Sequence, residues 1–172
     1  RGRVPCSLFF YVPMYSRIMS SSAEITDALV SRATLSPLIP SSYLNRPPRL
    51  FDFSRNNPDI YDVDMSDPMR LQTYIDTALA EADAAWGIGG YGEERFFYEK
   101  SELFRVGREY RSIHLGLDIW LPAGTEIFAP LDGRVHSFQC NAAFLDYGPT
   151  IILEHTVAGV EFYTLYGHLS RS

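Results

Sequence analysis

The residues whose side chains could together bind a metal ion lie in the last third of the sequence. All four histidines are found there: His114, His136, His155 and His168. The first belongs to the run IHLGLD, in which His114 precedes Asp118 by four residues. Because Zn²⁺ accepts both imidazole and carboxylate donors, this pair could supply two ligands of a zinc site. A surface His–Asp pair or a capped turn would give the same pattern.

The sequence around the pair indicates how it would be held. A spacing of four residues could place both side chains on one face of a helix. Gly116, the β-rich flank and Pro122 favour an extended segment instead. In such a segment residues 114, 116 and 118 share a face, and Gly116 leaves open space between the two side chains. We therefore expect the pair in strand-like backbone.

From about residue 95 onwards the apolar pattern is that of β-strands. Short runs rich in β-branched or aromatic residues alternate with turn sequences that contain Gly, Pro or Asp. Four runs are expected to be strands: residues 127–129, 133–138, 150–154 and 160–166. Since no helical pattern separates them, the sequence predicts a mainly β, antiparallel domain.

Two helices are predicted upstream. Ser21 and Glu24 form a capping-box pattern, which opens a short helix. Asp67 followed by Pro68 is typical of an N-cap and a first helical residue, and an apolar stripe then continues until Gly87. The stripe contains seven residues: Leu71, Tyr74, Ile75, Ala78, Leu79, Ala82 and Trp86. We expect it to pack on the β domain rather than to line a ligand site.

The first fifty residues differ in composition from the rest. They carry a charge balance of +4, against −10 for residues 51–172, and they contain nine Ser and six Pro. Such a composition is typical of an extended arm, and residues 1–23 also have some features of a targeting leader. We divide the chain into an extended arm with one short helix at 1–66, a helix and connector at 67–104, and the β domain at 105–172. A protein partner could order the arm.

Charge, hydropathy and cysteine content exclude several classes. The net charge of −6 argues against a nucleic-acid-binding protein, which would carry a basic face. No stretch approaches the roughly 18 apolar residues of a membrane span. The two cysteines, Cys6 and Cys140, are too few for a disulfide framework and are expected to be free thiols.

Several coupled motifs resemble those of the lysostaphin-type (LytM-like) zinc metallopeptidases. In that family an H-x-G-x-D element is followed by a P-x-G-T turn, an A-x-x-x-G-x-V strand pair and a Y-x-H-L-S segment. The matching segments here are His114 to Asp118, Pro122 to Thr125, Ala129 to Val135 and Tyr166 to Ser170. The resemblance covers about residues 105–172.

The resemblance implies a fold, a cofactor and a reaction. The fold is a mainly β, antiparallel β-sandwich with a groove, preceded here by a helix and the extended arm. Zinc would be bound by His114 and Asp118, and His168 matches an active-site histidine that orients water or stabilises the developing oxyanion. The reaction is peptide hydrolysis, usually of peptidoglycan cross-bridges or stem peptides. The family is typically exported to the cell envelope or secreted, yet the leader-like segment is poor, so an intracellular or organellar location stays open.

One element of the family pattern is missing. The family closes its site with an H-x-H element downstream of Y-x-H-L-S, and this sequence contains no H-x-H. His136 or His155 could supply the third zinc ligand in place of the missing H-x-H element. Their positions in or at the end of expected strands favour structural roles instead. The sequence is therefore interpreted as a fragment, a truncated gene product or a degenerate homologue used as a scaffold in a larger assembly.

A second resemblance is excluded by one residue type. The run from Gly124 to Val135 is also similar to the hairpins of lipoyl and biotinyl carrier domains. Those carriers need a lysine at the hairpin tip, and the sole lysine here is Lys100, upstream of the run. A working carrier domain is thus excluded, which leaves a peptidase or a catalytically inactive scaffold.

Overall fold

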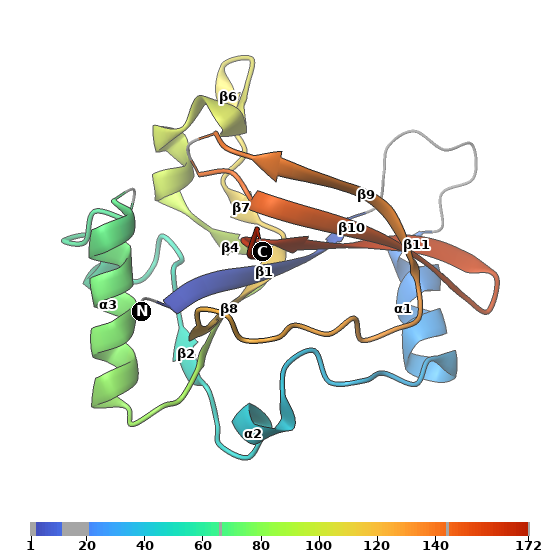
Figure 1. Ribbon diagram of the computed structural model, residues 1–172. Coiled ribbons are helices and arrows are strands. Elements are labelled where there is room, and N and C mark those ends of the chain that lie inside the picture. The colour runs from blue at the N-terminus through green and yellow to red at the C-terminus, as the bar shows by residue number, and fades with distance from the viewer. Residues whose placement is uncertain (1–2, 12–20, 66, 144, 172) are drawn as a thin grey trace.

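A seven-stranded sheet dominates the computed structural model, which describes residues 3–11, 21–65, 67–143 and 145–171 (Figure 1). The strands lie in the order β2 (Arg49–Phe51), β3 (Gly87–Gly89), β8 (Gly116–Pro122), β1 (Arg3–Tyr11), β11 (Val160–Gly167), β10 (Gly148–Val157) and β9 (Arg134–Asn141). All neighbours are antiparallel except the parallel pair β2–β3. The mainly β, antiparallel class expected from the sequence is confirmed.

Shorter elements surround this sheet. Two small ladders pair β4 (Glu93–Glu94) with β7 (Ile113–His114) and β5 (Arg105–Val106) with β6 (Glu109–Tyr110). The helices are α1 (Ser22–Arg32), α2 (Ser41–Leu44) and α3 (Pro68–Glu81), and three short 3₁₀ segments are Pro58–Ile60, Phe96–Lys100 and Glu102–Phe104. Among the described residues, no helix has the length and apolar character needed to cross a bilayer.

Both predicted helix starts are confirmed. The Ser21 hydroxyl accepts from the Glu24 backbone N–H at 3.2 Å, and the Glu24 carboxylate accepts from the Ser21 N–H at 2.6 Å. The Asp67 carboxylate caps α3 by accepting from the Met69 N–H at 2.9 Å. These side chains bond the backbone N–H groups that the first helical turn leaves without a partner in the helix.

The end of α3 differs from the prediction. The helix ends at Glu81, so Ala82 caps it and Trp86 lies outside it. Asp83 has φ +46°, which turns the chain out of the helical path before β3 begins at Gly87. The remaining stripe packs as expected, with Ile75 and Leu79 almost fully buried.

One predicted strand is absent. Residues 127–129 form irregular backbone instead of a strand. Their segment bonds to an upstream loop, because the Phe128 N–H donates to the Leu38 carbonyl at 2.9 Å and the Ser36 N–H donates to the Pro130 carbonyl at 2.8 Å. The other three predicted strands correspond to β9, β10 and β11.

Residues 1–66 contribute more regular structure than the expected arm. Arg3–Tyr11 forms β1, which lies between β8 and β11, and Arg49–Phe51 forms β2. Averaging the composition over fifty residues hid the strand-forming run from Leu8 to Tyr11. The part of the leader-like segment at 12–20 lies outside the described residues.

Strand β8 is buried on both faces of the sheet. Trp120 belongs to a cluster with α3 and the chain around β2, whose members are Phe51, Phe53, Ile60, Met65, Ile75, Leu79 and Phe97. Ile119 and Leu121 point the other way and pack with Ile39 and Trp86. Because neighbouring side chains of β8 are fixed on both sides, Asp118 on the same strand is held in a rigid frame.

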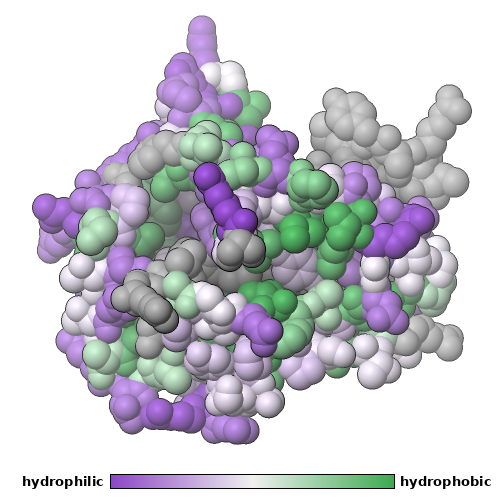
Figure 2. Space-filling view, in the orientation of Figure 1, coloured by the Kyte–Doolittle hydropathy of each residue, from purple (hydrophilic) through white to green (hydrophobic). Residues whose placement is uncertain are grey.

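Strand β9, at one edge of the sheet, is exposed. All but the last residue of β9 are exposed, including Val135 and Phe138. Figure 2 shows apolar residues gathered over the region where Figure 1 draws β9, β10 and β11. Strand β9 is therefore much more exposed than the inner strand β8.

Candidate metal centre

His114 and Asp118 lie close together where β7 leads into β8. His114 ends β7, only 3% exposed, and Asp118 lies in β8, 6% exposed. The expected extended backbone is therefore present at both residues. His114 Nε2 lies 3.5 Å from Asp118 Oδ2.

This separation fits two ligands of one zinc ion. Tetrahedral Zn²⁺ binds histidine nitrogen and carboxylate oxygen at about 2.0–2.2 Å each, which places two such donor atoms about 3.4 Å apart. The donor chemistry and the spacing of the pair thus match a zinc site. Among the described residues, however, no group of three or more His, Cys, Asp or Glu side chains could hold a metal ion.

The other nitrogen of His114 is held by a tyrosine. The Tyr98 hydroxyl oxygen lies 2.6 Å from His114 Nδ1. Burial lowers the pKa of His114 to about 4, although Asp118 opposes this shift. The imidazole is therefore neutral near pH 7, which is the form that binds metal ions. Burial also raises the pKa of Tyr98 to about 12, so its hydroxyl keeps its proton.

Arg95 contacts the carboxylate of the pair. Its Nη1 lies 2.7 Å from Asp118 Oδ2, and its Nε donates to Glu93 Oε2 at 3.0 Å. Arg95 is 4% exposed, and its pKa is raised above the usual arginine value by Asp118, Tyr98 and Glu93, against the opposing effect of burial. Asp118 is therefore part of a buried ion-pair network.

His168 lies on the far side of β1 from Asp118. Ser7 of β1 is the register partner of both Asp118 in β8 and Gly167 in β11, so the latter two are separated by two strand spacings, about 9.5 Å. His168 follows Gly167 directly and has φ +56°, and its N–H donates to the Tyr147 carbonyl at 2.6 Å. Burial lowers the pKa of His168, while Asp118 and Asp146 raise it in part. The sheet therefore brings His168 into electrostatic range of Asp118.

The other two histidines have different surroundings. His155 is 1% exposed; its Nδ1 lies 2.9 Å from the Asp132 carbonyl, and its Nε2 lies 2.7 Å from the Thr164 hydroxyl. His136 is exposed on β9, with its Nδ1 3.1 Å from the Ser137 hydroxyl. The structure does not bring either of them into a metal-ligand cluster with His114 and Asp118.

Sequence reasoning missed the residues that surround the pair. Tyr98, Arg95 and Glu93 lie 16 to 21 positions before His114, and their spacing carries no recognised motif. The ladder between β4 and β7 brings them to the site, because Glu93 is the register partner of His114. Tyr147 is a further neighbour: burial raises its pKa, and the charge of Asp118 contributes to that shift.

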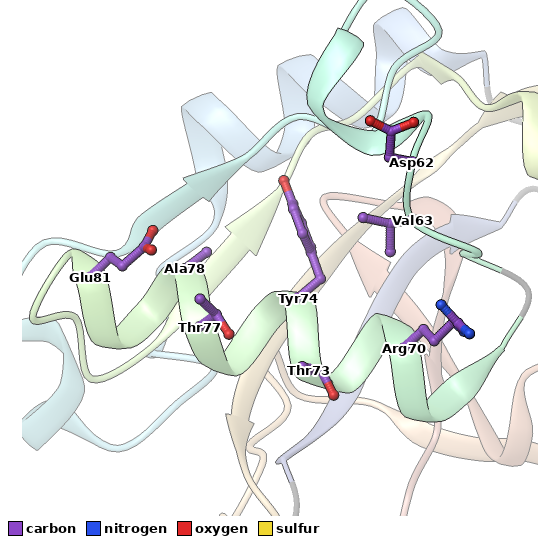
Figure 3. A pocket seen from close by; sticks show the side chains of 8 residues that line it. All are labelled: Asp62, Val63, Arg70, Thr73, Tyr74, Thr77, Ala78 and Glu81. Carbon is purple, nitrogen blue, oxygen red and sulfur yellow. The ribbon is translucent and has the colours of Figure 1, made fainter.

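A separate cavity of about 370 Å³ lies along α3 (Figure 3). It is lined by Asp62, Val63, Arg70, Thr73, Tyr74, Thr77, Ala78 and Glu81. None of these residues belongs to the His114–Asp118 network. The apolar stripe of α3 packs into the core beside it, in agreement with the packing role predicted for this helix.

Comparison with known proteins points to the same segment as the motifs. Residues 112–172 match the sequence model of Peptidase family M23. No curated protein and no solved structure matches the chain. The matched segment contains His114, Asp118 and His168 together with β8, β9, β10 and β11. The match therefore supports a LytM-like peptidase domain of family M23 at residues 112–172.

Proposed function

We propose that this domain hydrolyses peptide bonds with the help of a zinc ion bound in part by His114 and Asp118. The observation that supports this most directly is the buried donor pair, with His114 Nε2 and Asp118 Oδ2 3.5 Å apart. A bound zinc ion would lower the pKa of its water and polarise the scissile carbonyl group. A catalytic zinc site normally has three protein ligands, so the proposal requires a third donor from outside the described residues.

The residues of this chain would then have separate tasks. Tyr98 fixes the ring of His114 through Nδ1, so that Nε2 faces the metal position. His168 is proposed as the catalytic histidine. Because burial lowers its pKa, its imidazole is neutral near pH 7 and can accept or orient a proton of the attacking water. The substrate class that we propose is peptide, with the peptides of peptidoglycan as the first candidates.

A catalytically inactive scaffold is the second candidate function. It is favoured by one specific contact, the 2.7 Å ion pair between Arg95 and Asp118, which gives the carboxylate a cation without any metal. In that role the domain would bind a partner in a larger assembly and would not need a third ligand.

Metal analysis of the purified protein separates the two candidates. If the peptidase proposal is correct, the protein contains about one zinc ion per chain, and His114→Ala and Asp118→Asn lose it. His136→Ala is the matched control, since it removes an exposed imidazole from the same domain. Absence of zinc from the wild-type protein, even after dialysis against Zn²⁺, would contradict the peptidase and support the scaffold.

Activity provides the second half of the test. Purified peptidoglycan and its stem and cross-bridge peptides are incubated with the zinc-loaded protein, and products are separated by mass. We expect cleavage that a metal chelator abolishes. His168→Ala should retain zinc and lose cleavage, because the proposal assigns this histidine to catalysis and not to the metal ligands. Cleavage that survives the chelator would contradict a metal-dependent mechanism.

A further inference from the structure

We infer that Arg95 is the counter-cation of Asp118 in the metal-free protein: it holds the carboxylate in position and competes with a metal ion for the same oxygen atom. The inference deepens the proposed function and rests on it, because it concerns the metal affinity of the His114–Asp118 pair. Arg95 is thereby a positioning residue rather than a catalytic one.

The contact geometry identifies the shared atom. Asp118 Oδ2 lies 2.7 Å from Arg95 Nη1 and 3.5 Å from His114 Nε2. The oxygen that faces the histidine donor is therefore the same oxygen that accepts from the guanidinium. A metal ion bound between His114 and Asp118 would draw on electron density already engaged by Arg95.

The guanidinium is fixed by contacts on its other sides. Its Nε and Nη2 donate to Glu93 Oε2, and its centre lies 5.3–5.9 Å above three aromatic rings, those of Phe53, Phe97 and Tyr98. Glu93 is itself anchored, since its Oε1 accepts from the Phe53 N–H at 3.2 Å and the Gly90 N–H at 3.3 Å. Arg95 is thus a buried, preorganised partner and not a surface side chain that happens to reach Asp118.

Charge balance predicts the direction of the competition. With His114 neutral, Arg95, Glu93 and Asp118 carry a net charge of −1, and a divalent ion would change it to +1. Without the arginine charge, binding of a divalent ion would change the net charge from −2 to zero. A buried carboxylate that loses its counter-cation is costly, so a metal ion stabilises the protein more when Arg95 is absent.

The first experiment measures the metal-free pair. Urea unfolding with chelator present is compared for wild type, Arg95→Gln, Asp118→Asn and the double variant. We expect the two substitutions to be coupled, with the double variant more stable than additivity predicts by about tenfold in the unfolding equilibrium constant. Additive effects would overturn the inference. Should Arg95→Gln fail to fold, Arg95→Lys with and without Asp118→Asn provides the same cycle with the charge retained, and it should show weaker but measurable coupling.

The second experiment measures competition for the metal. Zinc affinity is determined by titration against a chromophoric chelator for wild type, Arg95→Gln and Glu93→Gln. We expect Arg95→Gln to bind zinc about tenfold more tightly than wild type, from the loss of a cation at contact distance. Glu93→Gln disturbs the same network but leaves Arg95 on Asp118, and its affinity should not rise. A gain in both variants would indicate general loosening and overturn the inference.

The outcomes distinguish this inference from the proposed function. Zinc binding by wild type with no gain in Arg95→Gln contradicts the competition alone and leaves the peptidase proposal intact. No zinc binding by either protein contradicts the proposed function and the competition together, and the stability cycle then decides whether Arg95 holds Asp118 in the metal-free protein.

Discussion

Two buried histidines in this molecule have nearly the same exposure and opposite surroundings. His155 is 1% exposed and His114 is 3% exposed. Both ring nitrogens of His155 lie within hydrogen-bond distance of oxygen atoms, those of Asp132 and Thr164. His114 has the Tyr98 hydroxyl at Nδ1, while its Nε2 faces a carboxylate at 3.5 Å, beyond normal hydrogen-bond length.

The difference separates a histidine that stabilises the fold from the one that we propose as a metal ligand. His155 stacks on Phe162 at 5.2 Å between ring centres, and a side chain at Gly133 would come within 2.7 Å of its Nδ1. Each ring nitrogen of His155 therefore has an oxygen partner within the protein. His114 lies instead in a network of charged and polar groups whose geometry suits a cation. Burial alone therefore does not distinguish the two histidines, whereas the chemical groups around their ring nitrogens do.

The largest expected effect is on stability, from His155→Ala. The substitution leaves a cavity beside Phe162 and removes the partners of the Asp132 carbonyl and the Thr164 hydroxyl, so the free energy of unfolding should fall by about 4 kcal/mol. Urea unfolding measures this loss. Zinc content should equal that of wild type, and a loss of zinc without a loss of stability would reverse the roles assigned to the two histidines.

Acid should destabilise the folded protein through His114. Because the pKa of His114 is about 4 in the folded protein and 6.5 in the unfolded chain, the unfolded state binds a proton first as the pH falls. Stability is therefore lost between about pH 6.5 and pH 4, by about 3 kcal/mol from this group, and the lowered pKa of His168 acts in the same direction.

A matched variant isolates this contribution. Unfolding of the metal-free protein is followed across that pH range for wild type and His114→Gln, which cannot take up the proton. The variant should lose clearly less stability on acidification. Parallel curves for the two proteins would show that His114 is not the group responsible.

Local patterns in the sequence predicted the elements but not their packing. The caps at Ser21 and Asp67 were predictable because each is formed by residues within three positions. The assignment of His114 and Asp118 to strand-like backbone was predictable from Gly116 and the flanking residues. The end of α3 was not, since an apolar stripe continues past the positive φ at Asp83 that ends the helix path.

Long-range pairing accounts for what the sequence did not reveal. β1 lies between β8 and β11, more than one hundred residues away from either, and no spacing rule connects such segments. Arg95 and Tyr98 likewise come to the site through the β4–β7 ladder and a short 3₁₀ segment. The proximity of His114 and Asp118 could thus be predicted from local sequence, whereas the groups around them are brought together only by tertiary structure.

Tyr98→Phe should weaken the metal site with a modest effect on the fold. It removes the hydroxyl 2.6 Å from His114 Nδ1 and keeps the ring, so zinc affinity should fall about tenfold and the free energy of unfolding by about 1 kcal/mol. Chelator competition and urea unfolding measure the two effects. Tyr74→Phe, at a partly buried tyrosine that packs on the α3 side of the core, is the control and should leave zinc affinity unchanged.

His136→Ala should have the smallest effect and extends the comparison to a third histidine. The ring is exposed on β9 and touches Tyr163 edge-on at 5.0 Å between ring centres, so the free energy of unfolding should change by less than about 0.5 kcal/mol. Zinc affinity should be unchanged, because His136 forms no metal-ligand cluster with His114 and Asp118 among the described residues. A marked loss of zinc would instead identify His136 as a donor, and β9 would then have to approach β8 in the metal-bound protein.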